Sequence, residues 1–249
     1  MQPDFSIAGQ RALVTGASRG IGHDLALALA GAGAEVLAGV RRLEDGAELA
    51  QASARITPFL LDVTDVAATR AAIDAEAAAN GPISILVNNA GLGFNHDAVD
   101  VGERDWDAMM DVNLKGLFFV TQAVARHMLA AGYGRVVNLS SQAGLVGIRR
   151  HAVYSASKGG VDLLTKVLAL EWADRGVTVN SVAPTYIRTP GTAERLDDPE
   201  IAADILGRIP AARSGTTADV AGAVLYLASP AAGLVTGTVL PVDGGWTAQ

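Results

Sequence analysis

The chain of 249 residues contains no cysteine and no long uninterrupted apolar run. The absence of cysteine excludes disulfides and cysteine-ligated metal sites, and we expect no metal site. Because no stretch approaches about eighteen uninterrupted apolar residues, the sequence predicts no membrane span. The start Met1-Gln2-Pro3-Asp4 lacks the basic and apolar regions of a secretory signal, so we expect a cytoplasmic location.

Positive charge is also scarce, because 19 Lys and Arg stand against 26 Asp and Glu and give a net charge of -7. This balance argues against nonspecific nucleic-acid binding, although a local basic patch can still hold one anionic ligand. Arg41 and Arg42 form a candidate for such a patch. An apolar content of 50% suffices for one sheet covered by helices, so we expect a single domain over residues 1–249.

Short apolar runs alternate with helical patterns along the whole chain. The predicted strands lie near residues 11–15, 34–39, 56–60, 83–88, 134–139, 177–182 and 237–241. This alternation predicts an α/β fold with one Rossmann-type, doubly wound parallel sheet and helices on both faces.

A glycine-rich turn follows the first predicted strand. The strand runs into Thr15-Gly16-Ala17-Ser18-Arg19-Gly20-Ile21-Gly22, and a helical pattern begins at Leu25. Glycines let the backbone approach a pyrophosphate, whose charge is met by free N–H groups and the positive end of the helix dipole. Because a second strand follows at βαβ spacing, the turn predicts a dinucleotide site.

Tyr154 and Lys158 are separated by four residues, which places both side chains on one helix face about one turn apart. A cation close to a phenol favours the phenolate and moves its pKa toward neutrality. The pair is therefore suited to proton exchange with an alcohol or ketone oxygen. Taken alone, a surface pair without such a role is the alternative.

Two further polar residues accompany this pair. Ser141 follows a predicted buried strand, from which it can reach the same substrate oxygen, although serines at this place often cap the next turn. We favour that capping role for Ser140. Asn113 stands inside a long helical pattern, where asparagine needs a particular reason to occur. A solvent-facing side chain is its alternative.

Together these segments resemble the short-chain dehydrogenase/reductase family. The shared motifs stand in order: Thr15 to Gly22, Asn88-Asn89-Ala90-Gly91, Asn113, Ser141, Tyr154 with Lys158, Val179-Asn180-Ser181-Val182-Ala183-Pro184, Thr189 and Val242-Asp243-Gly244-Gly245. The resemblance covers nearly the whole chain. One departure is Thr185, where the family usually has glycine, so the backbone beside the nicotinamide is expected to differ slightly.

The resemblance implies a set of site residues. The implied catalytic residues are Asn113, Ser141, Tyr154 and Lys158. The implied cofactor residues are Gly16, Ser18, Arg19, Gly20, Ile21, Arg41, Asp62, Val63, Asn89, Ala90, Gly91, Tyr154, Lys158, Pro184, Ile187 and Thr189. In this scheme Tyr154 exchanges the proton during hydride transfer, Lys158 lowers the tyrosine pKa and holds the ribose, and Asn113 supports a proton path behind Lys158.

The end of the second strand indicates the cofactor. An acidic residue there holds the ribose 2′-hydroxyl of NAD, whereas an arginine accommodates the 2′-phosphate of NADP. The chain has Val40 followed by Arg41 and Arg42, with Arg19 able to approach from the other side. We therefore expect NADP(H) to be preferred and NAD(H) to be possible. The alternative is that Arg41 and Arg42 are solvated loop charges.

The substrate is predicted only as a small carbonyl or alcohol compound. Ser141, His151 and Phe94 are the candidate contacts, and residues 189–213 are the expected lid. Apolar lid residues could cover a ligand or pack the lid itself, which we favour; they are Leu196, Ile201, Ile205, Leu206 and Ile209.

Three function classes remain open. The first is a carbonyl reductase or a polyol or sugar-alcohol dehydrogenase, with 3-oxoacyl-carrier-protein reductase as a variant. The second is a catalytically silent NADP-binding redox sensor, and the third is a non-enzymatic scaffold. Extra apolar faces on the helical patterns at 103–131 and 152–175 favour a homotetramer, without nucleic-acid or membrane partners.

Overall fold

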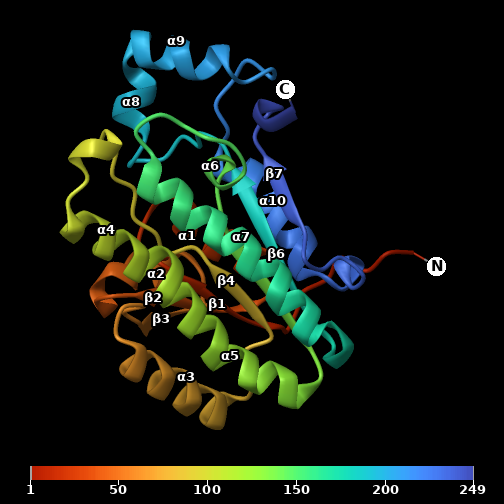
Figure 1. The fold of residues 1–249 in the computed structure, drawn as a ribbon. Coiled ribbons are helices and arrows are strands. Elements are labelled where there is room, and N and C mark those ends of the chain that lie inside the picture. Colours follow the sequence, from red (N-terminus) through yellow and green to blue (C-terminus); the bar gives the residue numbers. More distant parts are fainter. Residues whose placement is uncertain (1, 249) are drawn as a thin grey trace.

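The computed structural model describes residues 2–248, so Met1 and Gln249 of the predicted domain lie outside the described residues. Its centre is a parallel sheet with strand order β3-β2-β1-β4-β5-β6-β7 (Figure 1). The strands are β1 (Arg11–Thr15), β2 (Glu35–Val40), β3 (Ile56–Leu60), β4 (Ile85–Asn88), β5 (Gly134–Leu139), β6 (Val177–Pro184) and β7 (Val239–Val242). The predicted doubly wound α/β fold is confirmed, with every strand end within two residues of its expected place.

Helices cover both faces of the sheet. One face carries α1 (Gly20–Gly31), α2 (Ala47–Ala52) and α10 (Thr217–Ala228), and the other carries α3 (Val66–Asn80), α4 (Glu103–Met110), α5 (Leu117–Ala131) and α7 (Ala152–Trp172). In β1, Ala12 and Val14 pack against the first group and Leu13 against the second. Because successive side chains point to opposite buried faces, the strands read as continuous apolar runs.

Shorter elements connect these layers. They are the 3₁₀ turns η1 (Leu43–Gly46), η2 (Ala98–Asp100), η4 (Ala173–Arg175), η5 (Pro230–Ala232) and η6 (Trp246–Ala248), the π-helical turn η3 (Asp111–Gly116), and the helices α6 (Gln142–Leu145), α8 (Ala193–Asp197) and α9 (Pro199–Gly207). Within residues 2–248, no helix is both long and apolar enough to cross a membrane.

The strand order reverses between β1 and β4, which is where open α/β sheets bind ligands beyond the carboxyl ends of their strands. Polar contacts fix this point. The Thr15 hydroxyl accepts hydrogen bonds from the backbone N–H groups of Asn89 and Ala90, both at 3.0 Å. The Asn89 side chain donates to the carbonyls of Thr15 and Gly16 at 3.0 and 3.1 Å. The glycine turn is thereby held against the loop after β4.

Helices α8 and α9 project beyond the carboxyl ends of the strands, close to the chain's C-terminal turn (Figure 1). Leu196, Ile205 and Ile209 are buried in a small cluster, against which Tyr186, Leu206 and Trp246 pack. Most of the apolar side chains of residues 189–213 therefore pack the segment itself, as we favoured from the sequence. Ile201 remains 38% exposed.

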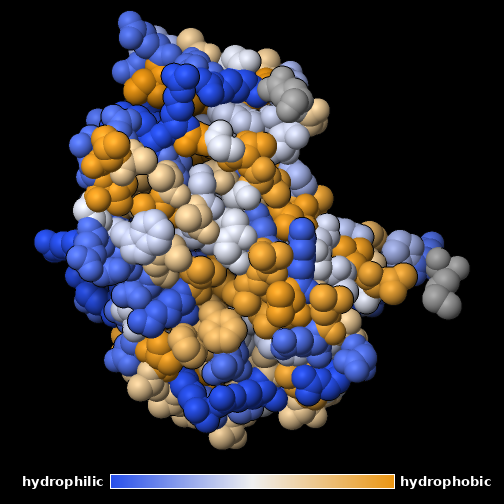
Figure 2. Space-filling model, in the orientation of Figure 1, coloured by the Kyte–Doolittle hydropathy of each residue, from blue (hydrophilic) through white to orange (hydrophobic). Residues whose placement is uncertain are grey.

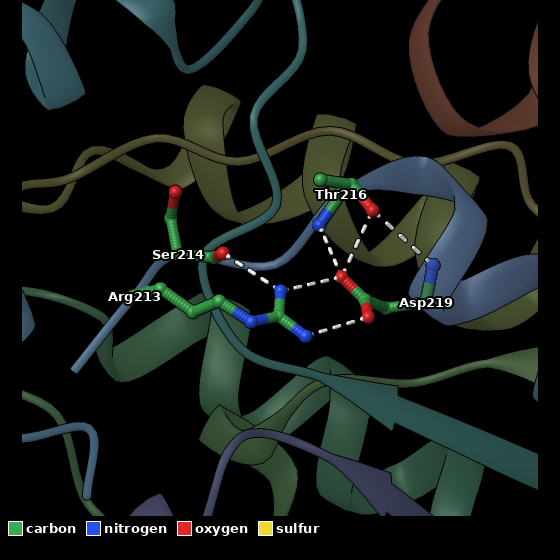
Figure 3. Close-up of polar contacts among 4 residues, drawn as sticks. All are labelled: Arg213, Ser214, Thr216 and Asp219. Carbon is green, nitrogen blue, oxygen red and sulfur yellow. Dashed lines mark hydrogen bonds and ion pairs between the residues drawn. The ribbon is translucent and has the colours of Figure 1, made fainter. Parts of the chain in front are cut away.

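Residues 189–213 end at a hydrogen-bonded contact with α10. The Arg213 guanidinium donates to both carboxylate oxygens of Asp219 at 2.8 Å, and Thr216 forms a reciprocal capping box with Asp219 (Figure 3). The hydrogen bonds from Arg213 and Thr216 hold the pKa of Asp219 well below its usual range. Because Arg213 is exposed, the pair adds little to stability, but it connects the end of this segment to α10.

Candidate active site

A cavity of about 350 Å³ opens beyond the carboxyl ends of β4, β5 and β6, a size typical of small-molecule sites. Ten of the predicted site residues line it: Ile21, Asn89, Gly91, Ser141, His151, Tyr154, Lys158, Pro184, Ile187 and Thr189. Residues far apart in the sequence thus meet at one cavity. The remaining predicted residues do not line it.

Lys158 is only 4% exposed, and its ammonium donates to the carbonyl of Leu139 at the end of β5, at 2.7 Å. The Lys158 Nζ atom lies 5.8 Å from the centre of the Tyr154 ring. Burial lowers the pKa of Lys158 to about 8, and the charge of Asp162, one turn further along α7, partly opposes this shift. Lys158 therefore changes its charge close to physiological pH.

Burial raises the pKa of the Tyr154 phenol; a hydrogen bond with Ser141 acts in the opposite direction, and the nearby Tyr186 reinforces the increase. The sequence predicts instead that Lys158 lowers this pKa. The difference has a physical cause, since the phenol loses its hydration and the Lys158 ammonium is bonded to the Leu139 carbonyl. In the protein alone, Tyr154 is a protonated donor.

Ser141 takes the capping role considered from the sequence. Its hydroxyl accepts a hydrogen bond from the Ala143 N–H at 3.1 Å, which caps α6, and it also bonds to Tyr154. Ser140, for which we favoured the capping role, is buried and donates to the Lys158 carbonyl at 3.4 Å. The expected cap is thus at Ser141 rather than Ser140.

Asn113 is fully buried in the π-helical turn η3, so its solvent-facing alternative is wrong. Its side chain accepts from the Leu92 N–H at 2.7 Å and donates to the Leu92 carbonyl at 2.9 Å and the Ser157 hydroxyl at 3.1 Å. π-Helical turns are frequent at functional sites. Asn113 does not line the cavity, but it fastens the loop after β4 to α7 beside Lys158.

The glycine turn fits a dinucleotide. Gly16 has a φ of +66°, and a Cβ there would lie 2.8 Å from the Ala90 Cα, so only glycine permits this close approach. Helix α1 starts after Arg19 without a side-chain cap, which leaves its N–H groups free for a phosphate. The Thr185 hydroxyl, at the cavity wall, is buried without a hydrogen-bond partner within residues 2–248.

The other predicted cofactor residues lie in the turns that follow these strands. Gly16, Ser18, Arg19 and Gly20 lead into α1, Asp62 and Val63 follow β3, and Asn89, Ala90 and Gly91 follow β4. Hydrogen bonds from Thr64 lower the pKa of Asp62, so this carboxylate is charged and available beside the expected adenine site.

Arg41 and Arg42 differ in their contacts. The Arg42 guanidinium donates to the Asp45 carboxylate at 2.7 and 3.1 Å, as expected for a solvated loop charge. Arg41 forms no ion pair with any residue in the described part of the chain. Val40, just before it, is 2% exposed at the end of β2. Arg41 is therefore the cation of this pair that is available to an anionic ligand.

The structure brings His151, but not Phe94, to the cavity wall. The His151 Nδ1 donates to the Arg149 carbonyl at 2.8 Å, and its ring meets that of Tyr154 edge-on, with centres 6.1 Å apart. Phe94 is 38% exposed, and its ring lies 6.5 Å from that of His96.

Several lining residues with polar side chains were not predicted from the sequence, among them Gln142, Tyr186 and Arg195. Gln142 directly follows Ser141, which was a usable signal, whereas Arg195 gave none within the lid segment. Within residues 2–248, no three His, Cys, Asp or Glu side chains form a group that could hold a metal ion.

A family model described as Enoyl-(Acyl carrier protein) reductase matches residues 16–247. The chain is 39% identical over 249 residues to the 2-dehydro-3-deoxy-D-gluconate 5-dehydrogenase of Escherichia coli, with 98% of each chain covered. It is 42% identical over 247 residues to the galactitol 2-dehydrogenase (L-tagatose-forming) of Cereibacter sphaeroides, covering 98% of this chain and 97% of that one.

The fold is similar to the crystal structure of a gluconate 5-dehydrogenase from Burkholderia cenocepacia in complex with NADP and tartrate. The TM-score is 0.95 at 40% sequence identity, with 98% of both chains covered.

The buried ammonium of Lys158 predicts a pH-dependent stability. The folded pKa is about 8, below the usual 10.5, so between these values the unfolded chain binds more protons. The free energy of unfolding of the wild type, relative to Lys158→Met, should rise by about 2 kcal/mol from about pH 7.5 to about pH 9.5. Denaturant unfolding without cofactor measures this, with the exposed Lys166→Met as control, and a constant difference for Lys158→Met would contradict it.

Proposed function

The chain belongs to the short-chain dehydrogenase/reductase family, and we propose that it is an enzyme that transfers a hydride between NADP(H) and a ketone or secondary alcohol. The observation that carries this function is the meeting of Ser141, Tyr154 and Lys158 at one cavity. The relatives named above act, by their names, on polyols and sugar acids. A polyhydroxylated substrate is therefore the best match.

In the reductive direction, bound NADPH supplies a hydride to the carbonyl carbon. The Tyr154 O–H donates its proton to the carbonyl oxygen, so that the ketone becomes an alcohol and the phenol a phenolate. The Ser141 hydroxyl donates a hydrogen bond to the same oxygen and stabilises its developing negative charge. The positive charge of Lys158 stabilises the phenolate until solvent returns the proton. Oxidation of the alcohol follows the same steps in reverse.

The cofactor assignment has its own support. The free N–H groups at the start of α1 suit the pyrophosphate, and Arg41 and Arg19 suit a 2′-phosphate. Asp62 and Val63 would hold the adenine side, and Pro184, Ile187 and Thr189 the nicotinamide side. Asn113 would act behind Lys158 by holding η3 and α7 together. Both the cofactor and the fold agree with the structural relative that binds NADP.

The other candidate functions have weaker support. An acyl-carrier-protein reductase agrees with the description of the family model, and the basic residues Arg126, Arg149 and Arg150 leave it open; of these, Arg150 pairs with Asp97 and donates to the Asn95 carbonyl. A catalytically silent sensor would not need Tyr154 and Lys158 at the cavity. We therefore retain the sugar-type oxidoreductase.

We propose further that one catalytic unit extends over the chain, that residues 189–213 close over the substrate, and that four copies assemble in the cytoplasm without nucleic-acid or membrane partners. Support for assembly comes from exposed apolar side chains on α7, where Leu163 is 64% and Leu170 is 86% exposed. Figure 2 shows hydrophobic surface gathered over the C-terminal half of α7. A surface of this kind is typical of protein interfaces.

Substitution of Tyr154 tests the proposed proton transfer. Tyr154→Phe should lower kcat by at least roughly 10³-fold, about 4 kcal/mol of transition-state stabilisation, because no other group supplies the proton. NADPH affinity should stay nearly unchanged. The matched control is Tyr226→Phe, far from the cavity, and a Tyr154→Phe enzyme within about tenfold of wild type would refute the assignment.

Cofactor preference is tested at the arginine pair. Wild type should prefer NADPH, and Arg41→Ala should lower kcat/KM for NADPH by about 10-fold to 150-fold while barely changing that for NADH. Arg42→Ala, which removes the arginine bonded to Asp45, should have less than about a threefold effect. Equal use of NADH and NADPH by the wild type would overturn the assignment of Arg41.

Assembly is tested by light scattering at micromolar protein. The expected mass is four times the 25.5 kDa of one chain. Leu170→Glu should split the tetramer, because it places a charge in the proposed interface, whereas Val99→Glu, at a residue 92% exposed on η2, should not. A monomeric wild type would contradict the proposal.

A further inference from the structure

The cavity wall is positively charged although the protein is acidic. The chain has a net charge of -7, yet the lining residues include Lys158 and Arg195, and within residues 2–248 no Asp or Glu lines the cavity. Lys158 is directed to the Leu139 carbonyl. Arg195, on α8 of the lid, is therefore the permanent cation that faces the cavity and whose side chain has no hydrogen-bond partner in the described part of the chain.

Arg195 is partly buried, and its guanidinium lies 5.7 Å from the centre of the Tyr186 ring. In the described part of the chain it forms neither a hydrogen bond nor an ion pair. By contrast, Arg188, which directly precedes the lid segment, bonds to Asp197 at 2.8 Å. A partly desolvated guanidinium without an anionic partner is unfavourable, and its planar donors match the two oxygens of a carboxylate.

Tyr186 places this cation close to the reaction centre. Its own phenol is near enough to Tyr154 to raise the pKa of that residue. The Tyr186 ring also packs on Trp246, with centres 5.9 Å apart, and both pack against the buried cluster of Leu196, Ile205 and Ile209. Arg195 therefore rests on a fixed aromatic platform beside the proton donor rather than on a solvated loop.

Neutral polar groups fill the rest of the wall. Asn95 and Gln142 offer amides, His151 an imidazole and Thr185 an unpaired hydroxyl, which suit the hydroxyl groups of a sugar chain. We propose that the substrate is a polyhydroxy carboxylic acid, or its keto form, whose carboxylate Arg195 binds by two parallel hydrogen bonds. This inference rests on the proposed function, because it names the substrate class of the same site.

The cofactor pyrophosphate is the competing anion for Arg195. Two observations favour the substrate over the pyrophosphate as the anion that Arg195 binds. The N–H groups at the start of α1 are free to bind the phosphates, and Arg195 lies over Tyr186, which neighbours Tyr154. A binding experiment with a matched pair of probes separates the two anions. L-Tartrate and L-threitol share a chain of four carbons and two secondary hydroxyls, but only tartrate carries carboxylates.

Isothermal titration of the NADP⁺-loaded protein should show L-tartrate binding at least about tenfold more tightly than L-threitol. Arg195→Gln, which keeps polar donors but removes the charge, should weaken tartrate by about 10-fold to 150-fold and leave threitol and NADP⁺ unchanged within about threefold. Arg195→Lys should fall between. Arg188→Gln, which removes a charge that pairs with Asp197 of α8 and does not line the cavity, should behave as wild type.

Equal affinity of the wild type for tartrate and threitol would overturn the inference, and so would an Arg195→Gln effect that falls on NADP⁺ instead of tartrate. Thermal unfolding of each variant establishes that it is folded. Turnover of neutral polyols without charge-selective binding would contradict this inference alone. Arg195-dependent tartrate binding without turnover of any alcohol or ketone would support it and contradict the proposed function instead.

Discussion

The burial of the Lys158 ammonium is the constraint on which the site depends. A cation withdrawn from water needs fixed partners, and Lys158 has the Leu139 carbonyl of β5 and the charge of Asp162 below it. These contacts fix α7 against β5, the strand that Ser141 follows. Gly144 allows this approach, because a Cβ there would lie 2.9 Å from the Lys158 carbonyl carbon. The ammonium is thus costly for stability but positions the proton donor, as is common in active sites.

A row of buried polar side chains sets the strand ends around this cation. The Asn88 amide on β4 donates to Asn138 on β5 at 2.8 Å, and Asn138 donates to Thr165 of α7 at 2.9 Å. Thr165 is in turn hydrogen bonded to Ser181 on β6 at 2.7 Å. Hydrogen bonds are directional, so they specify one relative position of these elements, which apolar packing alone does less well. Together with the Thr15 and Asn89 contacts, they keep four loops at one cavity.

The strands were predictable because both faces of the sheet are buried, so that each strand is a continuous apolar run bounded by glycine or polar residues. The meeting of Ser141, Tyr154 and Lys158 followed from motif spacing. The reason for Asn113 did not, since its partners Leu92 and Ser157 are distant in sequence. The place of Arg195 was not predictable either, because its five-residue helix is too short to show a hydrophobic period. The raised pKa of Tyr154 was not predictable because it depends on burial, which the sequence does not show.

In the proposed reaction, a hydride passes from NADPH to a carbonyl carbon while Tyr154 supplies the proton. Transfer of isotope tests it most directly: NADPH deuterated at C4, in each epimer, is incubated with the best ketone of a substrate panel, and the alcohol is analysed by mass spectrometry and NMR. The account predicts one deuterium on the carbinol carbon from one epimer and none there from deuterated water. Deuterium from neither epimer, or carbon-bound label from solvent, would contradict it.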